Sequence, residues 1–282
     1  MKKSICYWSF PGGLDGSKDV CEAIEEAAEY GYDAIELCIG GEGDITPDTS
    51  EGDCRRFAEK AEEVGVEIAS VASGLWWEAN FSDPDESVRA SAVETAKKSL
   101  QVTGWLGTDA LLTIPGAVDV FFDPDAAVVP YSEVMKRCKE GIKEILPVAE
   151  ECGVTAAVEV VWNKFLLSPI EMADFVDSFD SDRVGVYMDV GNVMPFGYPE
   201  QWIRHLGDRI TRVHFKDFKT AVGTAEGFCD LLEGDVNWPE VVSALDEIGY
   251  AGYCTAEMIP LYPYHPEVRV ANTSNAMDAI LG

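Results

Sequence analysis

Four side chains that bind metal ions well lie at the ends of four successive apolar runs in the second half of the chain. They are Glu159, Asp189, His214 and Glu257. Taken singly, each carboxylate could be an ion-pair or capping group and the histidine could be structural. An unpaired charge in an apolar strand is costly, however, and the same cost recurs on four consecutive runs. The recurrence predicts a shared divalent cation.

The ligand types also indicate which cation to expect. Three carboxylates and one imidazole form an oxygen-rich set, which suits Mn²⁺, Mg²⁺ or Co²⁺ better than a structural zinc site. We therefore expect one divalent ion, Mn²⁺ first, with Mg²⁺, Co²⁺ or Zn²⁺ as alternatives.

The four ligands can meet only if the strands that carry them end at the same place. Short β-type runs alternate with longer segments of helical period along the whole sequence. The expected strands cover residues 4–10, 34–39, 66–72, 110–114, 154–161, 184–189, 210–215 and 252–258. The expected helices cover residues 17–30, 50–64, 85–106, 131–152, 169–179, 199–206 and 238–248, with a weaker one after residue 266.

Eight strand–helix units of this size predict an α/β fold of the (β/α)8 TIM barrel type, with residues 1–282 as a single domain. An open doubly wound sheet is the alternative. Glycines directly after four of the expected helices, as in Val64-Gly65 and Cys152-Gly153, are typical left-handed helix ends. In such barrels the active site lies at the carboxyl ends of the strands, where the four ligands fall.

The charge balance limits the possible partners and environment. With 51 acidic and 21 basic residues, the formal net charge is −30, which argues against nucleic-acid binding. Such a charge suits a halophilic, salt-rich cytoplasm, because salt screens self-repulsion. The eight cysteines form no CxxC pair, and we find neither a membrane span nor a signal peptide. We therefore expect a cytoplasmic enzyme with a small-molecule substrate, for which a homodimer and a homotetramer are the candidate assemblies.

The sequence resembles the xylose-isomerase-like barrels of sugar-phosphate isomerases and epimerases, including ketose 3-epimerases and L-xylulose-5-phosphate 3-epimerase-like proteins. The resemblance covers essentially the whole chain, and it is carried by residues 31–36, 158–159, 162–165, 187–192, 197–202, 214–217 and Glu257. It implies a ketose or ketose phosphate as substrate. Where the ketose 3-epimerases have a substrate-binding histidine, this chain has Asn192, so their specificity for free ketoses does not carry over.

The implied mechanism can also be argued physically. A ketose chelates the ion through its carbonyl and a neighbouring hydroxyl, and the ion stabilises the enediolate that forms when a proton leaves. Glu159 and Glu257, on opposite sides, would act as the catalytic pair that removes and returns the proton. Return to the other face of the same carbon gives epimerisation, and return to the neighbouring carbon gives isomerisation.

Five further residues are candidates for binding the substrate, each with a structural alternative. Lys216 lies two residues after His214 on the same strand face. It would hold a substrate oxygen or phosphate, unless it pairs with an acidic residue. Lys164 is a second candidate for phosphate, and together these lysines favour a phosphorylated ketose. Glu36 faces either the cavity or a barrel ion pair, Trp162 either the pocket or the core, and Asn192 follows from the resemblance.

Three other functions compete with this prediction. A metal-dependent lyase of the inosose-dehydratase type would begin with the same proton abstraction but lose water. A DNA-repair endonuclease of this barrel type needs a multi-histidine zinc cluster, whereas the chain has three histidines and an unfavourable charge. A non-catalytic sugar-binding protein would need no paired glutamates.

The net charge of −30 predicts a fold that salt stabilises. Raising KCl from dilute to molar concentration shortens the Debye length to about 3 Å, so repulsion between surface carboxylates weakens. We expect the melting temperature to rise over this range in calorimetry. A flat or falling melting temperature would contradict a salt-adapted origin.

Overall fold

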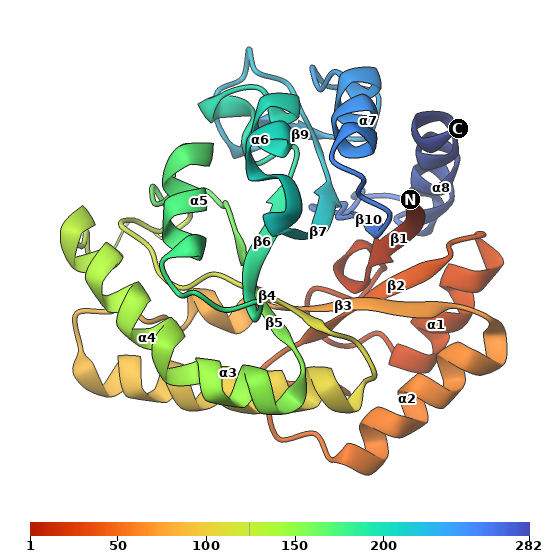
Figure 1. The fold of residues 1–282 in the computed structure, drawn as a ribbon. Coiled ribbons are helices and arrows are strands. Elements are labelled where there is room, and N and C mark those ends of the chain that lie inside the picture. The colour runs from red at the N-terminus through yellow and green to blue at the C-terminus, as the bar shows by residue number, and fades with distance from the viewer. Residues whose placement is uncertain (124) are drawn as a thin grey trace.

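The eight predicted strands close into a parallel barrel in the computed structural model, which describes residues 1–123 and 125–282 (Figure 1). The barrel strands are β1 (Lys2–Cys6), β2 (Ala34–Ile39), β3 (Glu67–Ser73), β4 (Ala110–Thr113), β5 (Thr155–Glu159), β6 (Val184–Asp189), β7 (Ile210–Phe215) and β10 (Tyr253–Ala256). Neighbouring strands follow the order β1-β10-β7-β6-β5-β4-β3-β2. The closed barrel is thus confirmed over the open sheet.

In the described part of the chain, eight α-helices are present, and they lie around the strands (Figure 1). They are α1 (Val20–Glu29), α2 (Glu51–Val64), α3 (Glu86–Trp105), α4 (Tyr131–Cys152), α5 (Pro169–Asp177), α6 (Pro199–Leu206), α7 (Trp238–Glu247) and α8 (Glu267–Leu281). Helix α8 packs beside β1, where Lys3 Nζ donates to Ser274 Oγ at 3.0 Å. Within the described ranges, no helix combines the length and the hydropathy that crossing a bilayer requires.

Local sequence accounts for many helix boundaries. Side chains of Asp19, Ser50 and Ser168 accept hydrogen bonds from backbone N–H groups in the first turns of α1, α2 and α5, which satisfies donors that lack an intrahelical partner. Gly65 and Gly153 end α2 and α4 with φ of 79° and 70°. These are the left-handed positions predicted from the sequence, and a side chain at either would be strained.

The main departures from the predicted elements lie at the carboxyl ends of the strands. Residues Tyr7–Ser9, expected as strand, form a short 3₁₀ helix, and the fifth strand ends at Glu159 rather than residue 161. A small hairpin of β8 (Asp217–Phe218) and β9 (Phe228–Cys229) was not predicted. Its strands are too short for periodicity to reveal. The buried Asp217 carboxylate anchors it, accepting from Trp238 Nε1 at 3.0 Å and from Leu232 N at 2.9 Å.

Helices α3 and α4 pack on the barrel near Gly141, where a side chain has no room. A Cβ at Gly141 would lie 2.3 Å from Cγ of the buried Phe81. We expect Gly141→Ala to lower the free energy of unfolding by ~1–3 kcal/mol through overpacking, measured by urea denaturation. The matched control is Gly52→Ala on exposed α2, where the nearest atom is 3.8 Å away and alanine favours the helix. Equal stability of both variants would contradict this packing.

Candidate metal centre

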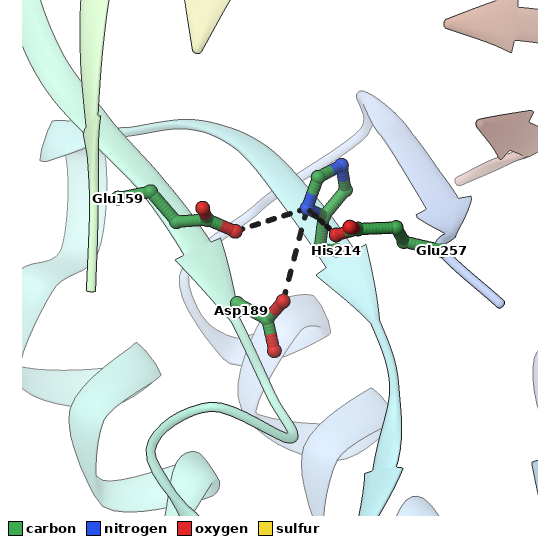
Figure 2. A group of neighbouring side chains, drawn as sticks. All are labelled: Glu159, Asp189, His214 and Glu257. Atoms are coloured by element: carbon green, nitrogen blue, oxygen red, sulfur yellow. Dashed lines mark hydrogen bonds and ion pairs between the residues drawn. The ribbon is translucent and has the colours of Figure 1, made fainter. Parts of the chain in front are cut away.

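The four predicted ligands converge inside the carboxyl end of the barrel. One ligand atom from each of Glu159, Asp189, His214 and Glu257 lies within 4.8 Å of the others, and all four residues are buried. Figure 2 shows the three carboxylates pointing at the imidazole Nδ1. This nitrogen lies 3.0 Å from Glu159 Oε1, 3.1 Å from Glu257 Oε2 and 3.7 Å from Asp189 Oδ2. We call these four residues the metal cluster.

Strand register places the cluster at one level of the barrel. Asp189 pairs directly with His214 between β6 and β7, and His214 pairs with Thr255 between β7 and β10. Glu257 lies just past β10, where its N–H donates to Phe215 O at 3.2 Å and extends the ladder. Because side chains alternate along a strand, this register brings the ligands to the barrel interior together.

Glu36 on β2 orients the imidazole from below. Its Oε1 lies 2.9 Å from His214 Nε2, and its other oxygen accepts from Ser70 Oγ at 2.8 Å and from the Tyr187 hydroxyl. Without an ion, both ring nitrogens of His214 can hold a proton between these carboxylates. A carboxylate at Nε2 would keep the proton on that nitrogen when a cation replaces the proton on Nδ1. This arrangement is the usual one for a metal-binding histidine.

The donor set fits a divalent cation. Asp189 is held in place because its Oδ1 accepts from the Asn192 N–H at 2.7 Å. Its Oδ2 is buried and faces the cluster, 3.7 Å from His214 Nδ1 and 3.1 Å from Lys216 Nζ. Three carboxylate oxygens and one imidazole nitrogen in a buried pocket are suitable ligands for Mn²⁺, Mg²⁺, Co²⁺ or Zn²⁺.

The protein environment makes the two glutamates electrostatically unequal. Burial raises the pKa of Glu159. Burial also acts to raise the pKa of Glu257, but the positive charges of Lys216 and His214 outweigh it and hold that pKa below its usual range. Lys216 Nζ lies 2.7 Å from Glu257 Oε2 and 3.1 Å from Asp189 Oδ2. Glu159 therefore binds a proton more readily than Glu257 does.

A cavity of about 730 Å³ opens above the cluster. Glu159 and Glu257 line it, and so do three of the predicted substrate-binding residues, Lys216, Asn192 and Trp162. Trp162 Nε1 also donates a hydrogen bond to the backbone oxygen of Asn192 at 3.3 Å. This bond connects the loop after β5 to the loop after β6. The structure thus places these five residues around one space.

Two of the predicted substrate-binding residues do not line the cavity. Glu36 is fully buried under His214 and is not among the residues that line the cavity; its partners are the imidazole, Ser70 and Tyr187. Lys164 also lies off the cavity wall. It has a positive φ of 56°, a side chain that is 64% exposed, and an ion pair with Asp119. Its ammonium is therefore directed to a surface carboxylate.

Sequence reasoning missed much of the cavity wall. Phe121 and Phe122 follow β4, and Phe228 belongs to the unpredicted hairpin; all three line the cavity. Two adjacent aromatic residues in a loop on the active-site side of the barrel were a usable signal for the first pair. The hairpin that carries Phe228 had no comparable signal.

A known protein family matches most of the length of the chain. Residues 24–277 match the family model described as "Xylose isomerase-like TIM barrel". The chain belongs to this family. The family assignment agrees with the resemblance inferred from the sequence and with the closed barrel.

Individual relatives of the family cover the whole chain. L-ribulose-5-phosphate 3-epimerase UlaE of Escherichia coli is 24% identical over 282 residues, with 99% of this chain and 96% of that protein covered. A crystal structure of D-psicose 3-epimerase with D-fructose has a TM-score of 0.79, 20% identity and full coverage of both chains. The IOLI protein with a bound zinc atom has a TM-score of 0.79 and 18% identity, with 100% and 98% of the two chains covered.

The role of Glu36 can be tested through metal affinity. Glu36→Gln keeps the size of the side chain but removes the charge that orients His214, so we expect Mn²⁺ to bind about 10–100-fold more weakly in calorimetry. Glu233→Gln, at an exposed carboxylate, is the matched control. The melting temperature of each variant without metal separates lost folding from lost affinity. Unchanged Mn²⁺ affinity in Glu36→Gln would contradict a positioning role.

Proposed function

We propose that this chain is a divalent-metal-dependent epimerase or isomerase that acts on a ketose or ketose phosphate. The observation that carries the proposal is the pair formed by Glu159 and Glu257. Both line the cavity, and each lies about 3 Å from the same imidazole nitrogen, on β5 and after β10 respectively. A substrate carbon held above the cluster would have a carboxylate on either side.

The names of the relatives support the same chemistry. UlaE is named as a 3-epimerase of a ketose phosphate, and D-psicose 3-epimerase is named as one of a free ketose. The zinc atom of the IOLI structure supports a metal in this kind of barrel. Bound to the cluster, a divalent ion would polarise the substrate carbonyl and so acidify the adjacent C–H bond.

The residues of the chain have distinct parts in the proposed reaction. Glu159, on one side of the substrate, would take a proton from the carbon. Glu257 on the other side delivers a proton to the opposite face, which gives the epimer. Lys216 would present its ammonium to a substrate oxygen at the cavity floor, and Asn192 lines the same cavity. Because both carboxylates are buried, protons would reach the carbon through these two groups, which exchange their own protons with solvent between turnovers.

Solvent exchange tests the proposed reaction directly. We expect Mn²⁺-loaded protein, incubated in D₂O with a panel of ketoses and ketose phosphates, to introduce deuterium at one carbon without a change in carbon skeleton. Glu159→Gln and Glu257→Gln should each reduce exchange by about 10²–10⁴-fold or more, because each removes a base. Glu171→Gln, which changes a carboxylate outside the cavity lining, is the control.

Metal content is measured alongside activity, since both glutamates also belong to the cluster. Full exchange in either variant at unchanged metal content would rule out the two-base mechanism. A product lighter by one water would instead identify the lyase reaction.

A further inference from the structure

The cavity has a polar floor and an apolar wall. The floor is formed at the strand ends by Glu159, Asn192, Lys216 and Glu257. Among the described residues, six aromatic side chains line the cavity. One is Trp8, and the other five, which we call the aromatic wall, are Trp77, Phe121, Phe122, Trp162 and Phe228. At about 730 Å³, the cavity lies in the upper part of the roughly 300–1,000 Å³ range of small-molecule sites. It has room for more than the reacting end of a sugar.

The aromatic wall is a continuous surface of ring contacts. Trp77 meets Phe122 edge to face with ring centroids 5.2 Å apart, and Phe122 meets Phe121 at 5.0 Å. Phe121 then contacts Trp162 at 5.8 Å, and Trp162 contacts Phe228 at 5.3 Å. Although the rings support one another, Phe121 and Phe122 remain 48% and 56% exposed. Adjacent exposed phenyl groups that face a cavity are typical of a surface which an apolar ligand covers.

Positive charge for a phosphate is scarce in the same cavity. Among the described residues of its lining, Lys216 is the only basic one, and its ammonium already contacts Asp189 and Glu257. The three carboxylates of the metal cluster and that of Glu36 would carry more negative charge than Lys216 and one divalent ion together could neutralise. Lys219, like Lys164, lies off the lining and pairs with a surface carboxylate, Glu233, at 3.4 Å. Of the lysines that favoured a phosphorylated ketose in the sequence, Lys216 lines the cavity and Lys164 does not.

From these observations we infer that the substrate is an uncharged sugar carrying an aryl or alkyl group beyond the carbons that react. The hydroxyl and carbonyl groups lie on the polar floor, and the apolar group stacks on the aromatic wall. Stacking gains free energy both from buried apolar area and from ring–ring contact. This inference rests on the proposed function for the reacting end of the sugar, and it separates this chain from UlaE, which is named for a phosphorylated sugar.

A matched series of sugars tests the substrate class. Each of the D-ketohexoses is prepared as the free sugar, the 6-phosphate and the 6-O-benzyl ether, and binding to Mn²⁺-loaded protein is measured by calorimetry alongside deuterium exchange in D₂O. We expect the benzyl ether of at least one ketohexose to bind about tenfold or more tightly than its free sugar and its phosphate.

A pair of variants locates the apolar contact. Phe122→Ala should bring the affinity for the benzyl ether down toward that of the free sugar, and the high exposure of Phe122 means that the fold does not depend on it. Tyr264→Ala removes another exposed aromatic ring, 84% exposed and outside the cavity lining, and should leave the preference for the benzyl ether intact.

The outcomes separate this inference from the proposed function. Exchange that favours phosphates, or that treats all three forms alike, overturns the apolar substrate class while the epimerase stands. Tighter binding of benzyl ethers, lost in Phe122→Ala, without exchange in any sugar supports the apolar class and counts against the epimerase. If no sugar exchanges deuterium and the benzyl ethers bind no more tightly than the other forms, both the apolar substrate class and the epimerase are overturned.

Discussion

The structure depends on one electrostatic constraint, the concentration of carboxylates inside the carboxyl end of the barrel. Glu36, Glu159, Asp189 and Glu257 are at most 5% exposed and surround a single imidazole. Buried charges at this density are tolerated only when they are paired or bind a cation. Lys216 offsets part of the charge, and a divalent ion bound to the metal cluster would offset two charges more.

Rigid elements and loops contribute different parts of the site. Strand register fixes the cluster, and hydrogen bonds from Ser70 and Tyr187 hold Glu36 against His214, so the ligands approach one point with little freedom. The loops after the strands and the β8–β9 hairpin supply the aromatic wall. A rigid floor suits proton transfer, for which small displacements are costly, whereas loops are where specificity changes most easily.

The cluster and the barrel were predictable because their signals are local. Each ligand ends an apolar run, and glycines such as Gly65 and Gly153 separate the units. The partners of Glu36 were not predictable, since Ser70 and Tyr187 meet it only through barrel closure. The direction of the Lys164 side chain was not predictable, because it depends on a left-handed backbone conformation in a loop. The position of Phe228 depends on a hairpin whose strands have two residues each, too few to show a periodic pattern in the sequence. The expected stabilisation of the fold by salt stays a prediction.

The most direct test of a metal centre at the end of the barrel is anomalous diffraction from crystals grown with Mn²⁺. The account predicts one strong peak, roughly 2.0–2.4 Å from ligand atoms of Glu159, Asp189, His214 and Glu257, with Glu36 retained on His214 Nε2. Density without an anomalous peak at this point, with Lys216 still bound among the carboxylates at saturating Mn²⁺, would contradict it.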